Sequence, residues 1–123
     1  MKQAGLNLSV NDCAEHFKKS LQEKGFTIFC DINHQENAKT VNIDMPASRV
    51  IIFGNPMAGT KLMLEDINMS LDLPLRLALV EKDKKTYLIH QTSEDYCNNY
   101  KVANHPVLEK IDTLFAVLTT ELQ

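Results

Sequence analysis

The strongest structural signal in this 123-residue sequence is an apolar stripe close to its C-terminus. After His105 and Pro106, apolar side chains recur every three or four residues, which is the spacing of one face of an α-helix. The stripe consists of Leu108, Ile111, Leu114, Phe115, Leu118 and Leu122. Proline suits the first turn of a helix, where N–H groups have no partner within the helix. A helix that begins near His105 must therefore bury this stripe against a sheet or a second subunit.

The rest of the chain alternates between helical and strand-like segments. A first helix is predicted from about Asn11 to Gly25, and a short helix is predicted after Ser93 as its cap. Strand-like apolar segments cover residues 6–8, 26–32, 50–53, 75–80 and 86–90. The last two segments flank a charged turn and should pair as an antiparallel hairpin. We therefore predict an α+β fold, in which a mixed sheet of about five strands packs against helices in a single domain, residues 1–123.

Two of the predicted strands imply a particular pattern of burial. The first contains Phe26, Ile28, Cys30 and Ile32 at alternate positions, so these side chains should share one face of the strand. On that face Cys30 would be a buried and inert thiol. The second, residues 50–53, is continuously apolar, which is typical of a central strand that is buried on both faces.

Charge and cysteine content exclude several classes of protein. The formal net charge is −3 and no dense cluster of Lys and Arg is present, so nucleic-acid binding is not expected. No segment approaches the roughly 18 apolar residues of a membrane-spanning helix, and the N-terminus lacks the apolar run of a signal peptide. The three cysteines show no paired spacing. We expect a cytoplasmic protein without a disulfide, metal or cofactor and without a membrane partner.

The middle of the chain resembles domain-of-unknown-function family 302. The resemblance is carried by Phe53-Gly54-Asn55-Pro56, by Gly59-Thr60 with Leu62-Met63, by Asp72-Leu73-Pro74-Leu75-Arg76, and by the shorter matches Gly25-Phe26-Thr27-Ile28-Phe29 and Ile32-Asn33-His34. It implies a small α+β domain with a mixed sheet, and a homodimer. The apolar surface of the last helix favours a homodimer as well. The resemblance implies no activity, because the family is named for the lack of one.

The connection formed by residues 54–60 is the candidate site for a small, possibly anionic ligand. It contains Gly54, Asn55, Gly59 and Thr60, and it joins a predicted strand to a helix that Thr60 would cap. Free N–H groups and the helix dipole attract anions to such a helix start. The order Gly59-Thr60-Lys61 is not the Gly-Lys-Ser/Thr ending of a phosphate-binding loop, so nucleotide hydrolysis is not expected. The alternative is that the segment is a turn and a cap without further function.

Two classes of function follow from these residues. In the first, the chain is a homodimeric binding module, in which Arg76 binds the anion beside the loop and Asp72 either orients Arg76 or caps nearby N–H groups. In the second, it is a small enzyme that uses His34 with Asp72 or Arg76, and this class requires a water-excluding pocket around His34. No nucleophile motif is present, so the sequence favours the binding module.

Overall fold

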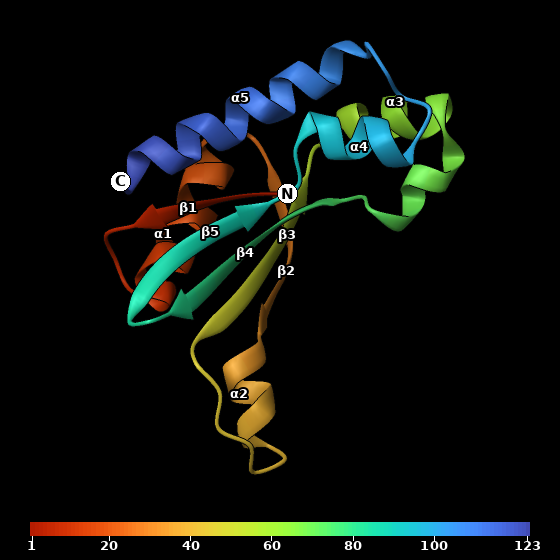
Figure 1. The fold of residues 1–123 in the computed structure, drawn as a ribbon. Helices are drawn as coiled ribbons and strands as arrows, with labels where there is room; N and C mark the ends of the chain where they lie inside the picture. The colour runs from red at the N-terminus through yellow and green to blue at the C-terminus, as the bar shows by residue number, and fades with distance from the viewer.

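The computed structural model describes residues 1–123 and contains five strands, five α-helices and one short 3₁₀ helix (Figure 1). The strands are β1 (Lys2–Leu6), β2 (Thr27–Asn33), β3 (Ser48–Gly54), β4 (Leu75–Lys82) and β5 (Lys85–His90). The helices are α1 (Val10–Glu23), α2 (His34–Lys39), α3 (Pro56–Glu65), the 3₁₀ helix η1 (Ile67–Leu71), α4 (Ser93–Asn99) and α5 (Pro106–Glu121). None of the helices has the length and apolar composition needed to span a membrane.

The five strands form one sheet in the order β1-β5-β4-β3-β2, and every neighbouring pair is antiparallel. The α+β class, the strand number and the β4–β5 hairpin are confirmed, but the prediction of a mixed sheet is wrong. A parallel pair requires a crossover connection between neighbouring strands. Helix α1 is the long connection between β1 and β2. These two strands are the opposite edges of the sheet, so α1 does not join neighbouring strands.

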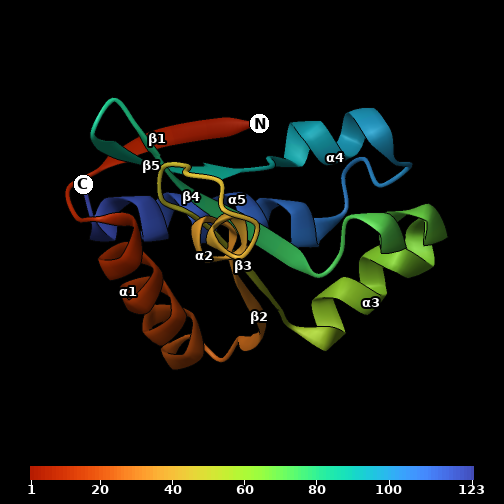
Figure 2. The same ribbon diagram turned by 90° about the horizontal axis from the view of Figure 1, so that it is seen from below.

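The helices that cover the sheet, α1, α3 and α5, all lie on one of its faces. Figure 1 views the other face, with no helix in front of the strands, and Figure 2 shows α1 and α3 together on the covered side. The covered face presents buried side chains from the three central strands: Ile51, Phe53, Leu75, Leu77, Leu79 and Leu88. These side chains belong to a single core of 22 buried apolar residues, which also includes Phe17 and Leu21 of α1. One continuous core accounts for the cohesion of the chain.

Aromatic contacts connect the helices to the sheet at its centre. The ring of Phe53 packs edge-on against Phe26 and Phe115, with centroids 5.6 and 6.1 Å away. The ring of Phe115 in α5 is also stacked on His90 of β5, 3.9 Å away. The predicted stripe of α5 is therefore covered within the protomer: its members are buried except Leu114, which is half-buried. The expected surplus of apolar surface on this helix is absent, so α5 gives no support for a dimer.

A β-bulge changes the predicted pattern of β2. Ile28 lies opposite Phe53, but Cys30 lies opposite Ile52, so Phe29 is an extra residue in the strand. Beyond the bulge, Asp31 faces the helices, where it forms ion pairs with Arg49 and Lys18. Cys30 faces the uncovered side and is exposed, so the prediction of a buried thiol is wrong. An alternating pattern does not reveal a bulge, because one inserted residue exchanges the two faces.

The prediction that β3 is buried on both faces is also wrong. Ile51 and Phe53 are buried on the covered face, whereas Val50 and Ile52 are only half-buried on the other. Burial on both faces requires helices that cover both sides of the sheet, and here the covering helices α1, α3 and α5 lie on one side.

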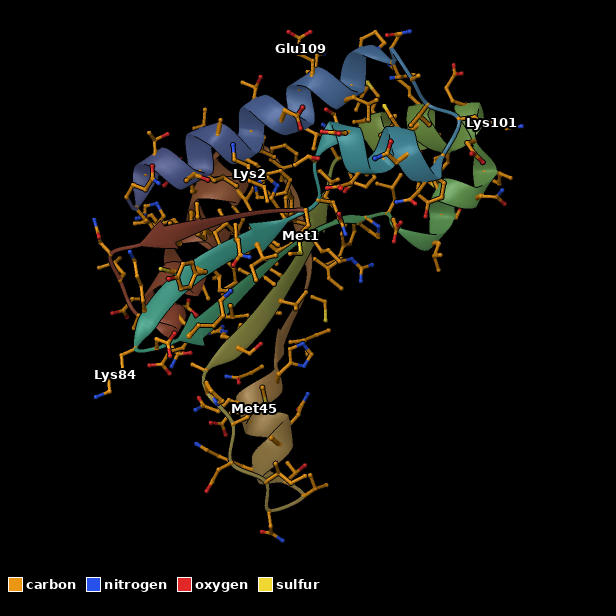
Figure 3. The ribbon with its side chains drawn as sticks, in the orientation of Figure 1. Met1, Lys2, Met45, Lys84, Lys101 and Glu109 are labelled. Carbon is orange, nitrogen blue, oxygen red and sulfur yellow. The ribbon has the colours of Figure 1, made fainter.

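The segment between β2 and β3, residues 34–47, projects beyond the end of the sheet (Figure 1). We call this segment, which contains α2 and the loop after it, the arm. Asn33 caps α2 by accepting a hydrogen bond from the Glu36 N–H, and the Gln35 side chain donates to the Met45 carbonyl at 3.1 Å. Figure 3 shows Met45 on this projecting segment, away from the body of the molecule.

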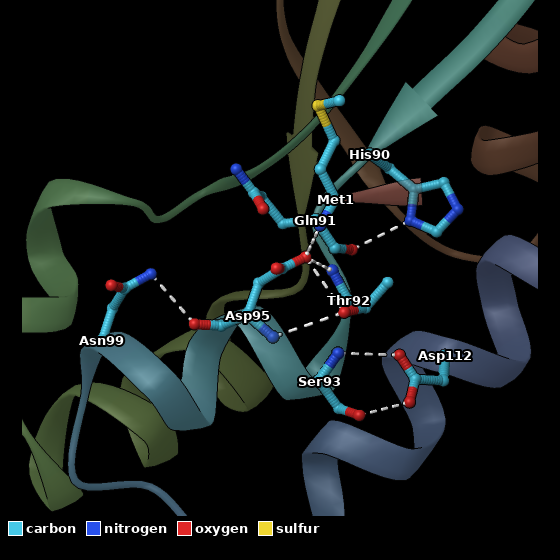
Figure 4. Close-up of polar contacts among 8 residues, drawn as sticks. All are labelled: Met1, His90, Gln91, Thr92, Ser93, Asp95, Asn99 and Asp112. Carbon is cyan, nitrogen blue, oxygen red and sulfur yellow. Dashed lines mark hydrogen bonds and ion pairs between the residues drawn. The ribbon is translucent and has the colours of Figure 1, made fainter. Parts of the chain in front are cut away.

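Polar contacts fix the corner between β5 and α4 (Figure 4). Thr92 is the N-cap of α4, one residue before the predicted cap Ser93, and it forms a capping box with Asp95. The N-terminal amino group is bonded to the Asp95 carboxylate and lowers the pKa of that carboxyl to about 2. The Ser93 N–H donates to Asp112 of α5 at 2.9 Å. These contacts join the first residue of the chain, α4 and α5.

Buried contacts of α5 should dominate the stability of the protein. We predict that Leu118→Ala, which removes a fully buried side chain, lowers the free energy of unfolding by about 2–5 kcal/mol. The matched control is Val117→Ala on the same turn, where the side chain is 42% exposed and the expected change is about 0.5 kcal/mol or less. Urea unfolding followed by circular dichroism measures both. Equal losses for the two variants would contradict the packing described above.

The imidazole of His90 should make stability depend on pH. Burial lowers the pKa of His90, nearby Lys2 adds to this effect, and Asp112 and the Gln91 carbonyl oppose it. Below about pH 6.5 the unfolded chain then binds more protons than the folded one, so stability falls as the pH falls. We predict that wild type loses more stability between about pH 7.5 and 5.5 than His90→Gln does. Identical losses in urea unfolding would show that His90 titrates alike in both states.

Candidate functional site

A pocket of about 450 Å³ lies between α3, α5 and the sheet. It is bounded by the start of β2, the end of β3 and the start of β4, and its lining residues from α3 and α5 place it on the covered side of the sheet. Eleven of the 19 lining residues are hydrophobic. They include Phe26 and Phe29 from the β2 end, Met63 from α3, and Ile111 and Leu114 from α5. Pockets of this size and composition are typical of sites for small molecules.

Four of the seven site residues expected from the sequence line this pocket: Gly54, Asn55, Gly59 and Thr60. Asn55 and not Thr60 caps the helix, because α3 begins at Pro56 and Thr60 lies inside its second turn. The helix starts earlier than predicted because Asn is a good N-cap and Pro suits the first helical position.

The start of α3 leaves little free backbone for an anion. The Met57 N–H donates to the Asn55 side-chain oxygen at 3.0 Å, and the Gly59 N–H donates to the Asn55 carbonyl at the same distance. Pro56 has no N–H at all. Neither glycine adopts a positive φ. The expected mechanism, in which an anion binds to the open backbone of a helix start, is therefore not favoured by this geometry.

Lysine side chains provide the charge at the pocket. Lys61 of α3 and Lys110 of α5 are the only ionisable residues among those that line it, and both are exposed. No Asp, Glu, His or Cys lines the pocket. An apolar interior with two cations at its edge is suited to a molecule that is apolar at one end and negatively charged at the other.

The bulge in β2 brings Phe29 to the pocket. Phe29 remains 53% exposed although it lines the pocket, so part of its ring faces solvent. Gly54 lies beside this ring, and a Cβ atom there would be in ordinary van der Waals contact, 3.5 Å from the Phe29 ring and 3.4 Å from the Cβ of Pro74. The bulge therefore shapes one wall of the pocket, with Gly54 packed next to it.

The other three expected residues, His34, Asp72 and Arg76, lie outside the pocket. Asp72 accepts a hydrogen bond from the Tyr100 hydroxyl, which raises the pKa of that phenol, and the contact joins η1 to the end of α4. Arg76 is exposed and points to the uncovered face, because its neighbours Leu75 and Leu77 face the helices. Arg76 and Asp72 therefore do not flank the loop as an anion partner and its orienting group.

His34 is exposed at the first position of α2 and does not line the pocket described above. Arg76 of β4 lies opposite Ile52 of β3, and Ile52 lies opposite Cys30 of β2. His34 lies four residues farther along the chain, about 13 Å away along the strand direction. The enzyme hypothesis required His34 to meet Asp72 or Arg76 in a closed pocket, and the structure does not bring these residues together. No group of three or more His, Cys, Asp or Glu residues is placed to hold a metal ion.

Sequence reasoning missed most of the pocket wall. Phe29 was hidden by the bulge, and Lys110 and Leu114 belong to α5, about fifty residues from the loop in sequence. Lys61 directly follows Thr60 and is the one signal of charge at the pocket that lies beside the loop in the sequence.

The fold and the pocket define a small α+β domain with a one-sided antiparallel sheet. The chain belongs to the family described as "Domain of unknown function DUF302", whose sequence model matches residues 3–118. A solved structure of an uncharacterised conserved DUF302 protein from Bacillus stearothermophilus has the same fold, with a TM-score of 0.82. The two sequences are 15% identical, and the alignment covers 99% of this chain and 97% of that one.

Sequence relatives are found in Brucella. A protein of Brucella suis biovar 1 named "Fluoride-specific ion channel FluC 1" is 35% identical over 81 residues, which is 65% of this chain and 32% of that protein. A protein of Brucella melitensis biotype 1 named "Fluoride-specific ion channel FluC 2" is also 35% identical over 81 residues, or 30% of its length. This chain spans about a third of these relatives, so the likeness does not transfer their named activity to it.

Gly59 gives a test of the pocket geometry. Its φ is not positive, and a Cβ atom there would meet only the Leu73 side chain, at 4.0 Å. We predict that Gly59→Ala raises the free energy of unfolding by about 0.5–1 kcal/mol, because alanine loses less entropy in a helix. The control is Gly25→Ala, where φ is +88° and a loss of stability is expected. A loss in Gly59→Ala, measured by urea unfolding, would mean that this side of α3 is packed more tightly than described.

Proposed function

We propose that this chain binds a small amphipathic anion, with its apolar part in the pocket between α3 and α5 and its charged group near Lys61 and Lys110. The observation that carries the proposal is an apolar pocket whose only ionisable lining residues are two lysines. A medium-chain carboxylate is the simplest molecule with this chemistry.

Apolar contact would supply most of the affinity. Each Å² of apolar surface removed from water contributes about 25 cal/mol, and the side chains of Phe26, Phe29 and Leu114 contribute such a surface to the pocket lining. The exposed part of Phe29 would be covered by the ligand, which gives a reason for an aromatic ring held at the opening by a bulge.

The lysines would select the charge of the ligand and its orientation. Both are exposed, so each contact with an anion is expected to contribute only about 0.2–1 kcal/mol. Two such contacts correspond to a preference of roughly tenfold for an anion over a neutral molecule of the same length. Asn55 and Thr60 are further polar residues in the pocket lining.

Binding is favoured over catalysis because no carboxyl, imidazole or thiol group lines the pocket. Its only hydroxyl belongs to Thr60, and no histidine or carboxylate lies beside it as a general base. The three free cysteines, two of them exposed, suit a reducing compartment, so we propose a cytoplasmic site of action.

Isothermal titration calorimetry with decanoate tests the proposal. We predict that wild type binds decanoate and binds decanol about tenfold more weakly, because the alcohol cannot use the lysines. The double variant Lys61→Gln/Lys110→Gln should bind decanoate about as weakly as wild type binds decanol. Lys19→Gln on the exposed side of α1 is the control for a change of net charge and should bind as wild type does.

A filled pocket separates specific binding from adsorption to the surface. Gly59→Leu directs its side chain toward the open space beside Leu73 and should abolish binding while the protein stays folded. Thr113→Leu adds similar bulk to an exposed position of α5 outside the pocket and should leave binding unchanged. If wild type binds neither decanoate nor decanol, or if Gly59→Leu binds as well as wild type, this pocket is not the site.

A further inference from the structure

The face of the sheet that no helix covers is largely apolar. Strand register places on it the half-buried side chains Ile32, Val50, Ile52, Ala78, Val80 and Ile89, which come from β2 to β5. We call this surface the open face; it faces the viewer in Figure 1. An antiparallel sheet with one solvated face normally alternates apolar residues inward with polar residues outward. β3, β4 and β5 do not follow that rule, and an apolar surface that spans several strands marks a site of association.

The arm adds a second exposed apolar surface at one end of the same sheet. Its Val41 and Ile43 are 63% and 59% exposed, and the arm extends past the body of the molecule (Figures 1 and 3). A short helix of six residues with no buried side chain has little stability of its own. The arm would gain contacts if its apolar residues packed against another surface.

The two surfaces have complementary charges. The open face carries Arg76, Lys82 and Lys85 and no Asp or Glu. The arm carries Glu36 and Asp44 against one lysine, Lys39, so its formal charge is −2 + 1 = −1. One protomer thus presents both an apolar cationic face and an apolar acidic arm.

We infer that the open face binds the open face of a second copy of this chain, with each arm packed beside the partner's sheet. A two-fold dimer requires a surface that is complementary to itself, and a face with an arm of opposite charge meets this requirement. Five strands about 4.8 Å apart and six residues long give a face on the order of 500 Å². A stable interface buries about 800 Å² on each partner, so the arms would supply the remainder.

Light scattering coupled to size-exclusion chromatography tests this interface at about 50 µM protein. Two chains of 13.9 kDa give 2 × 13.9 = 27.8 kDa, which we expect for wild type. Ile52→Lys and Val80→Lys place a charge on the open face and should give folded monomers. The matched control, Val117→Lys, places the same charge on the exposed side of α5 and should remain a dimer. A monomeric wild type, or a dimer that only Val117→Lys dissociates, would overturn the inference.

A measurement on the unaltered protein decides the question if the lysine variants do not fold. Cys30 lies on the open face and Cys97 lies on α4, and both thiols are exposed in the protomer. The rate of thiol modification at Cys30 should fall several-fold as the protein concentration rises through the dimerisation range, while the rate at Cys97 stays constant. Equal rates at the two cysteines at every concentration would show that the open face remains free.

Discussion

The contact on which the rest of this structure depends is the packing of Phe53 between Phe26 and Phe115. It joins β3, the turn before β2 and α5 at a single buried point, and Phe115 extends the contact to His90 of β5. Edge-on aromatic pairs contribute about 0.5–1.5 kcal/mol beyond their buried area, and their geometry fixes the distance of the helix from the sheet. The pocket begins directly beside this cluster, with Phe26 and Ile111 in its wall.

Because every covering helix lies on the same side as Phe53, the two faces of the sheet have different chemistry. On the covered side, α3, α5 and the ends of the strands line an apolar pocket whose only ionisable lining residues are Lys61 and Lys110. On the open side, half-buried apolar residues lie beside exposed cations. The bulge at Phe29 affects both faces, since it turns Phe29 toward the pocket and Cys30 toward the open face.

Local signals in the sequence predicted most helices and strands. Features that depend on tertiary structure could not be predicted from them. The stripe of α5, the β4–β5 hairpin and the loop beside Gly54 follow from spacing and turn residues that act over a few positions. The bulge at Phe29 and the all-antiparallel sheet could not be predicted, because they depend on which strands become neighbours. For the same reason, the predicted position of Arg76 beside the loop is wrong. Arg76 follows Leu75 in β4 and points to the open face of the sheet, whereas the pocket lies on the covered face.

The central claim is that the two faces of one sheet have separate roles, one for a small amphipathic anion and one for a second copy of the chain. Methyl NMR spectra recorded at two protein concentrations, with and without decanoate, test it most directly. The account predicts that decanoate shifts the methyl signals of Ala58 and Leu114, and that concentration shifts those of Ile52 and Val80. If both changes move the same signals, or if neither moves any, the account is contradicted.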